Sequence, residues 1–141
     1  MRNKVIFLLL FYTAAVFQLQ ACDSDADINY KRNYVNGKGL YEKYCQNCHG
    51  ADGTGLARLY PPLTDTTYLI ENKALLPCII KNGQNKEIIV HRETYDGEMP
   101  GNGNLADIEI AQIIVYITNS FGNNQGSYAA AQVTSALKDC D

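Results

Sequence analysis

The chain has 141 residues, a length that suits one domain and is too short for two. Hydrophobic residues make up 46% and charged residues 19%, so the composition is that of a globular protein. The formal net charge of -3 excludes the strongly basic balance of a general nucleic-acid binder. We therefore expect one globular domain, monomeric, that binds no nucleic acid.

Residues 1–21 have the features of an export signal. The basic residues Arg2 and Lys4 precede an apolar run of about 13 residues, Val5 to Phe17. This run is short for a helix that must cross roughly 30 Å of hydrocarbon, although an uncleaved membrane anchor is the alternative. Removal of the signal would take away two of the 12 basic residues. The remaining 10 face 15 acidic residues, which gives a net charge of about -5.

The signal ends in Leu19-Gln20-Ala21-Cys22, which resembles the lipobox of bacterial lipoproteins. In that family the cysteine thiol receives a diacylglycerol, and the leader is cut just before it. The resemblance implies that Cys22 is lipidated and that the chain is exported and anchored on the periplasmic side of a membrane. Residues 22–33 are polar and acidic, and we expect them to form a short tether.

Residues 34–45 carry apolar side chains at rough helical spacing, which predicts the first helix of the domain. Gly37 and Gly39 weaken that helix, and their presence indicates that another helix crosses it closely. Residues 50–67 contain several glycines and prolines and are expected to form a loop.

The second half of the chain predicts two more helical regions. Residues 67–82 are expected to be partly helical, with Pro77 in the first turn of a helix and Gly83 at its end. Residues 86–90 are expected to form a short strand or an extended loop. Residues 107–121 form the clearest amphipathic helix, whose apolar stripe consists of Ile110, Ile113, Ile114 and Ile117.

The most specific signal in the chain is Cys45-Gln46-Asn47-Cys48-His49. Two thiols at this spacing can each add to one vinyl group of a haem, and the adjacent histidine then supplies an imidazole to the iron. The same residues could bind zinc, but no second cysteine pair at finger-like spacing exists, or form a redox dithiol, which would normally follow a strand. We therefore predict haem c bound covalently to Cys45 and Cys48, with His49 as an axial ligand.

A six-coordinate iron needs a second axial ligand. Outside the signal the chain has one methionine, Met99, and one further histidine, His91. Met99 lies in a polar loop rich in glycine and proline, from which its side chain can project inward. We expect Met99 as the ligand, with His91 as the alternative. A thioether raises the midpoint potential, and it fills the position that oxygen or peroxide chemistry would need.

The stretches around these residues resemble class I c-type cytochromes over about residues 34–122. They are the Gly37 to Tyr41 run, Tyr60-Pro61-Pro62-Leu63, Met99-Pro100 and the helix over 105–122. The resemblance implies an all-α class I cytochrome c fold over residues 34–123, with three to five short helices around one haem.

The resemblance also implies roles for individual residues. The carbonyl of Pro61 would accept the Nδ1 proton of His49, and Leu63 would pack on the haem. Ala106 occupies a position where the family often has a capping serine or threonine, so Asn104 or Asp107 is expected to cap the last helix. Tyr95 and Arg92 are further candidates for haem contacts.

Two cysteines remain once the other three are assigned to lipid and haem. In an oxidising compartment such a pair, here Cys78 and Cys140, often forms a disulfide. Residues 124–141 form a C-terminal extension whose apolar residues suggest a short helix that folds back. We predict the disulfide, with two free thiols as the alternative.

These observations predict a single-electron carrier whose iron alternates between the ferrous and ferric states. Its partners would be redox proteins, namely an oxidase, a reductase or a dehydrogenase, met at the haem edge near Cys45 and Cys48. A second hypothesis is haem catalysis or gas sensing with Met99 displaced, for which the sequence offers no catalytic acid or base. A third is a structural lipoprotein that binds zinc, which would lack the optical spectrum of covalent haem.

Overall fold

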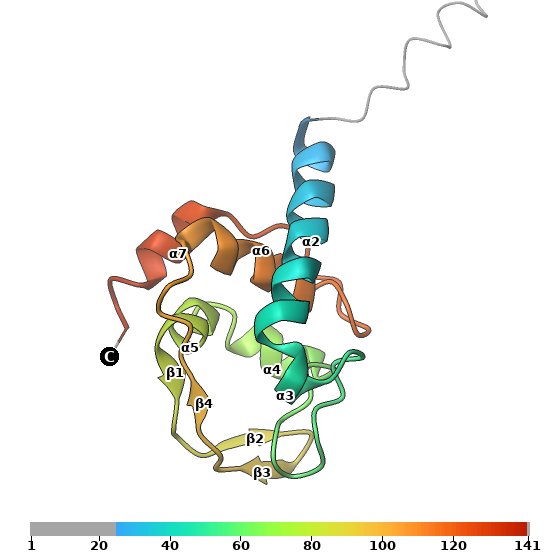
Figure 1. The fold of residues 1–141 in the computed structure, drawn as a ribbon, viewed down its shortest axis with the longest axis vertical. Coiled ribbons are helices and arrows are strands. Elements are labelled where there is room, and N and C mark those ends of the chain that lie inside the picture. Colours follow the sequence, from blue (N-terminus) through green and yellow to red (C-terminus); the bar gives the residue numbers. More distant parts are fainter. Residues whose placement is uncertain (1–24, 141) are drawn as a thin grey trace, which may run out of the picture.

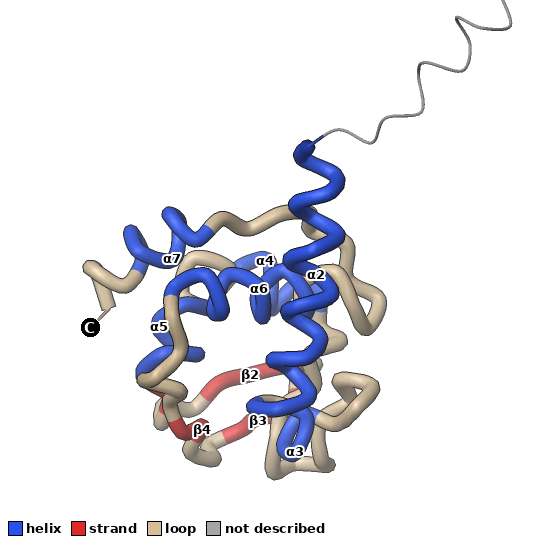
Figure 2. Tube along the Cα trace, turned by 45° about the horizontal axis from the view of Figure 1, so that its top comes forward, coloured by secondary structure: helices blue, strands red, loops and turns tan. Residues whose placement is uncertain are grey.

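The computed structural model describes residues 25–140, so the predicted signal peptide and Cys22 lie outside the described residues. Six helices and four short strands occupy this part of the chain (Figure 1), and both views place the strands together at one end, away from α7 (Figure 2). In the range 25–140 no helix is long and apolar enough to cross a membrane. The helices are α2 (Asp25–Tyr44), α3 (Gln46–His49), α4 (Thr66–Glu71), α5 (Leu76–Asn82), α6 (Asp107–Ile117) and α7 (Ala130–Ala136).

The core forms where α2 crosses α6. A Cβ atom on Gly37 of α2 would lie 1.9 Å from the carbonyl oxygen of Gln112 in α6, so the backbones meet where a side chain has no room. Next to this point Tyr41, 1% exposed, packs against Tyr116 with ring centroids 5.2 Å apart. The predicted close crossing of two helices at Gly37 is therefore confirmed.

The helix α6 is buried on most of its surface because α2, α5 and α7 all pack against it. The predicted apolar stripe is confirmed, and Ala111, Val115 and Tyr116 are buried as well. The helix ends at Ile117, earlier than the expected residue 121. Neither Asn104 nor Asp107 caps its start. Instead the N-cap is Ala106, whose N–H donates to Glu109 Oε2 at 2.8 Å, because a glutamate three residues on can reach back.

The predicted tether is largely helical, since α2 already begins at Asp25. Two tyrosines account for the difference. Tyr30 and Tyr34 stack at 6.3 Å and pack against the core, and the Tyr34 hydroxyl bonds to Ser120 Oγ at 2.9 Å. Asp27 and Lys31, one turn apart, form an ion pair of 2.7 Å. The domain therefore begins before residue 34.

The fold is not all-α, and the described residues form six helices where three to five were expected. The strand β1 (Gly83–Gln84) pairs with β4 (Met99–Pro100), and β2 (Ile88–Val90) pairs with β3 (Glu93–Tyr95), both antiparallel. The expected strand at residues 86–90 is thus β2. His91 and Arg92 form its hairpin turn with φ angles of 50° and 66°, as a two-residue hairpin requires.

The C-terminal extension contains α7, which packs on α6 and α5 and buries Val133 completely. Cys140 follows α7 and is joined to Cys78 of α5 by a disulfide, with Cα atoms 5.6 Å apart. The extension therefore folds back onto the domain, as the sequence predicts.

Candidate haem-binding site

An apolar cavity lies between α3, α5, α6 and the strands, and it encloses about 930 Å³ with its open mouth included. Nearly all of its surface is apolar. The aliphatic lining residues are Leu59, Leu63, Leu69, Leu76, Ile79, Ile80, Ile88, Ile113 and Ile117.

One wall of the cavity is formed by the predicted haem-attachment motif. Cys45 directly follows α2, and the short helix α3 brings Cys45 and His49 to the same side, with the N–H of His49 donating to the Cys45 carbonyl at 3.0 Å. Cys45, Cys48 and His49 all line the cavity. The structure therefore brings together the three residues that the motif singles out.

The imidazole of His49 is oriented by the loop that follows. It is 9% exposed, and its Nδ1 donates to the Pro61 carbonyl at 3.0 Å, as the resemblance implied. Burial lowers the pKa of His49, although the bond to Pro61 opposes this shift. The ring is therefore neutral at neutral pH, and its Nε2 keeps the lone pair that binds a metal.

The Cys45 thiol differs from that of an ordinary surface cysteine. Burial, followed by the neighbouring Cys48, raises the pKa of Cys45 to about 12. A thiol with such a pKa is a poor nucleophile at neutral pH.

A second wall carries Met99. This residue lies in β4 rather than in a free loop, paired with Gln84 of β1, and it lines the cavity. Figure 1 shows β4 beside β1 and apart from α3. His49 and Met99 thus line one cavity from two separate elements.

The remaining predicted contacts are split. Tyr95, 7% exposed, and Leu63 line the cavity, whereas Arg92 lies on a separate hollow beside Asp65. Sequence reasoning missed two polar residues of the lining, Tyr68 and Gln84, whose side chains bond to each other. Neither belongs to a motif, so only the fold brings them to the site. Burial raises the pKa of Tyr68, while its bond to Gln84 opposes that shift.

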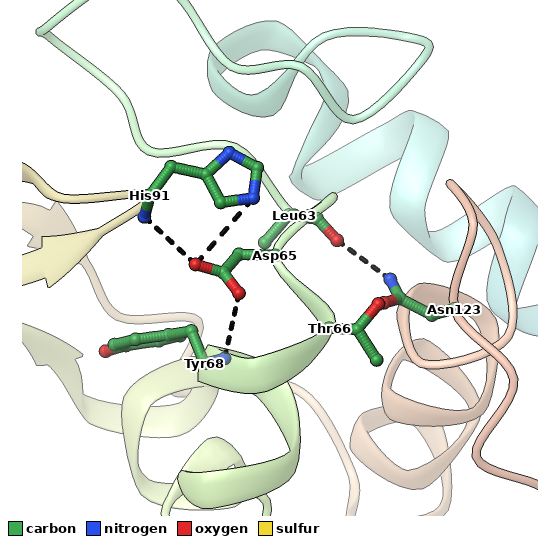
Figure 3. A network of polar contacts seen from close by, with 6 residues as sticks. All are labelled: Leu63, Asp65, Thr66, Tyr68, His91 and Asn123. Carbon is green, nitrogen blue, oxygen red and sulfur yellow. Dashed lines mark hydrogen bonds and ion pairs between the residues drawn. The ribbon is translucent and has the colours of Figure 1, made fainter.

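His91, the alternative ligand, is not among the residues that line the cavity. Its N–H donates to Asp65 Oδ2 at 2.9 Å, and its Nε2 lies 3.7 Å from the same oxygen. Asp65 also caps α4 by accepting from the Tyr68 N–H at 3.1 Å (Figure 3). The imidazole of His91 is 53% exposed, so of the two candidate ligands only Met99 lines the cavity together with His49.

The zinc alternative is not favoured by the geometry. Within residues 25–140 no group of three or more histidine, cysteine, aspartate or glutamate side chains gathers closely enough to hold a metal ion. The two thiols and the imidazole of the motif therefore do not converge as tetrahedral zinc ligands would.

The profile of a protein family described as cytochrome C oxidase, cbb3-type, subunit III, matches residues 32–117, well over half of the chain. The chain belongs to this cytochrome c family. It follows that the cofactor is a covalently bound haem c with its iron, and the thiols, imidazole and apolar cavity described above fit that group. The family also indicates an electron-transfer component rather than a catalytic enzyme.

Two relatives carry a more specific description. The chain is 33% identical over 106 residues to the cytochrome c subunit of alcohol dehydrogenase (quinone) from Gluconacetobacter polyoxogenes, and equally to that from Komagataeibacter europaeus. The alignment covers 71% of this cytochrome and 22% of each relative. The chain therefore spans about a fifth of the length of these relatives.

Proposed function

We propose that this cytochrome carries single electrons between redox proteins, with His49 and Met99 as the two axial ligands of the haem held by Cys45 and Cys48. The observation that carries the proposal is that both side chains line one apolar cavity from two separate elements, α3 and β4. When bound, the haem supplies reversible one-electron chemistry at its iron. With both axial positions taken by protein, no position stays open for a substrate.

Each residue has a defined task in this proposal. Cys45 and Cys48 hold the cofactor covalently, and the Pro61 carbonyl keeps Nδ1 of His49 protonated so that Nε2 faces the cavity. The sulfur of Met99 is a soft ligand that favours reduced iron. The aliphatic lining excludes water. Because an apolar surrounding disfavours the additional charge of ferric iron, the lining also favours reduced iron, as Met99 does.

A lipid on Cys22 would hold this cytochrome on the periplasmic side of a membrane. Support comes from the signal over 1–21 and from the Leu-Gln-Ala-Cys ending. The Cys78–Cys140 bond suits an oxidising compartment, and we include its formation in the mature protein in the proposal. Cys22→Ser should move the protein from the membrane fraction to the soluble fraction, and a variant that stays in the membrane would contradict lipid anchoring.

The partner class that we favour is a dehydrogenase that donates electrons. The two relatives are cytochrome c subunits of quinone-dependent alcohol dehydrogenases, although this chain matches only 22% of their length. An oxidase or a reductase is then the acceptor. Reduction of the ferric protein by dehydrogenase-rich membranes supplied with a substrate alcohol tests the donor, and no faster reduction than without alcohol would exclude it.

The decisive experiment compares Met99→Ala with His91→Ala in the haem-loaded protein. Loss of the thioether should lower the midpoint potential by on the order of 0.1 V and let the reduced protein bind carbon monoxide. His91→Ala should change neither property, because His91 lies outside the cavity. Axial ligation by Met99 fails if Met99→Ala keeps the parent potential, or if His91→Ala produces the changes instead.

A further inference from the structure

The strand that carries Met99 is built on α5, and α5 is linked covalently to the C-terminal extension. We infer that the Cys78–Cys140 disulfide is a positioning element for Met99, so that the extension decides how firmly the axial sulfur is held. The inference rests on the proposed axial role of Met99. It adds a role for residues beyond 117, where the match to the cytochrome c family ends.

The first step is the junction between α5 and β4. The helix ends at Asn82, and Gly83 passes straight into β1, where it pairs with Pro100 while Gln84 pairs with Met99. A Cβ atom on Gly83 would lie 2.3 Å from the Met99 carbonyl oxygen. The backbones of α5's end and of the Met99 strand are thus in direct contact, and neither can shift alone.

The second step is the segment that follows Met99. The N–H of Asn102 donates to the Ile80 carbonyl at 2.9 Å, and Lys81 Nζ donates to the Leu105 carbonyl at 2.6 Å. Both partners on the helix side belong to the last turns of α5. Hydrogen bonds to α5 therefore hold the segment between β4 and the start of α6 at more than one point.

The third step is that α5 is short and, although Leu76 and Ile80 pack into the core, its first turn has no side-chain cap. It has seven residues, and its N-cap, Leu75, makes no side-chain capping bond and is 54% exposed. A helix of this length is marginal without tertiary support. Cys78 lies in its first turn, so the disulfide fixes the end of α5 that is opposite to the Met99 strand.

The fourth step is that the extension is a firm anchor. Val133 and Tyr128 are 0% and 5% exposed, and α7 packs against α6 as well as α5. The turn that leads to α7 is held by Asn119, whose Oδ1 accepts from the N–H groups of Gln125 and Gly126 at 3.0 and 2.8 Å. The disulfide therefore ties α5 to α6 through the extension, whose helix α7 packs on both.

The test is a titration of the ferric, haem-loaded protein with imidazole, which competes with Met99 for the iron. The apparent affinity for imidazole rises with the fraction of molecules in which the sulfur has left. We expect Cys78→Ser combined with Cys140→Ser to bind imidazole about tenfold more tightly, a change of roughly 1.4 kcal/mol. The midpoint potential of the double variant should also be lower, and its methionine-to-iron absorption band should be weaker.

A matched control separates positioning from general stability. Val115→Ala removes a fully buried side chain of α6 that does not line the cavity, so it lowers the free energy of unfolding and leaves the disulfide intact. This variant should keep the parent imidazole affinity. The inference is overturned if the double serine variant unfolds more easily but keeps the parent affinity, potential and absorption band.

Two further readouts keep the experiment decisive. If the double variant does not mature, the parent holoprotein is treated with a dithiol, its released thiols are alkylated and its iron is reoxidised before the same titration. If the parent protein itself shows no methionine-to-iron band and Met99→Ala changes nothing, the proposed ligation fails. That result differs from the one in which Met99 is a ligand but ignores the disulfide.

Discussion

The two walls of the haem cavity differ in the sequence separation of the residues that form them. Cys45, Cys48, His49 and Pro61 belong to one short stretch, and their order is kept by a helical turn and one hydrogen bond. The wall of Met99 combines α5, β1, β4 and, through Cys78, the C-terminal end.

This difference indicates which wall of the cavity opens more easily. The histidine wall is local, and in the proposed arrangement two thioether bonds keep it attached to the cofactor even when the domain unfolds. The methionine wall depends on pairings of two residues each and on one short helix, features typical of segments that open at low free-energy cost. As denaturant is added, the bond from the Met99 sulfur to the iron should therefore break before the bond from His49.

His49→Ala should have the largest effect, because it removes the ligand around which the local wall is organised. Without the imidazole, the haem would face a cavity whose other side chains on that wall are mostly aliphatic. We expect the yield of haem-loaded protein to collapse, as measured by haem staining after denaturation and by intact mass. His91→Ala is the control and should mature normally. A normal yield of six-coordinate His49→Ala protein would contradict this assignment.

Gly37→Ala should come next, because it pushes apart the helices that support the histidine wall. The α2 helix leads straight into Cys45, and the new methyl group would overlap the Gln112 backbone. Overpacking of this kind costs about 1–3 kcal/mol or more, measurable by urea unfolding of the holoprotein.

Gly39→Ala is the matched control for that change. Its Cβ would meet nothing within 4 Å, so it should stabilise the helix by about 0.5–1 kcal/mol. Equal losses of stability in both variants would show that helix propensity, and not the crossing, governs this position.

Gly83→Ala tests the other wall. Its φ of +81° disfavours a side chain, and the methyl group would collide with the Met99 carbonyl. With a ψ of -174°, this backbone conformation is one that essentially only glycine adopts, and a side chain forced into it costs about 1–3 kcal/mol. We expect haem to stay attached while imidazole displaces the sulfur more readily than in the parent protein. If attachment is lost as completely as in His49→Ala, the two walls are not separable.

The same contrast explains what the sequence reveals. The histidine wall could be predicted residue by residue, because the attachment motif has a fixed spacing and the resemblance places the Pro61 carbonyl. Met99 could be selected as a candidate because it is the one methionine outside the signal. Its place in a strand paired with Gln84 could not be predicted, since a two-residue strand leaves no periodic pattern. Two β-pairings were therefore missing from the expected all-α fold.

Other misses have the same physical origin. Residues 25–33 are polar enough to suggest a tether, yet Tyr30 and Tyr34 find the core and extend α2. The cap of α6 is supplied by Glu109 from within the helix rather than by a residue before it. In both cases a partner outside the local pattern decided the structure, as it does for the Met99 strand.

Asp65→Ala should have the smallest effect, because Asp65 is not among the residues that line the haem cavity. The carboxylate caps α4 and also holds the turn of the hairpin that leads to Tyr95 (Figure 3). Loss of a capping residue costs about 1 kcal/mol. Asp65→Asn keeps one acceptor oxygen and should lose less. Urea unfolding of the three holoproteins measures the order, and a larger loss for asparagine than for alanine would contradict capping.

The dependence of this effect on pH follows from the charge of Asp65. Burial alone would raise its pKa, but the N–H groups of His91 and Tyr68 outweigh it, and the pKa lies below its usual value. A lowered folded-state pKa means that the stabilisation is complete above the unfolded value of about 3.9 and disappears as the pH falls through the folded value. The gap in unfolding free energy between the parent and Asp65→Ala should therefore persist down to about pH 5 and shrink toward pH 3. A gap of the same size at pH 3 would mean that shape alone, and not the carboxylate charge, holds this turn.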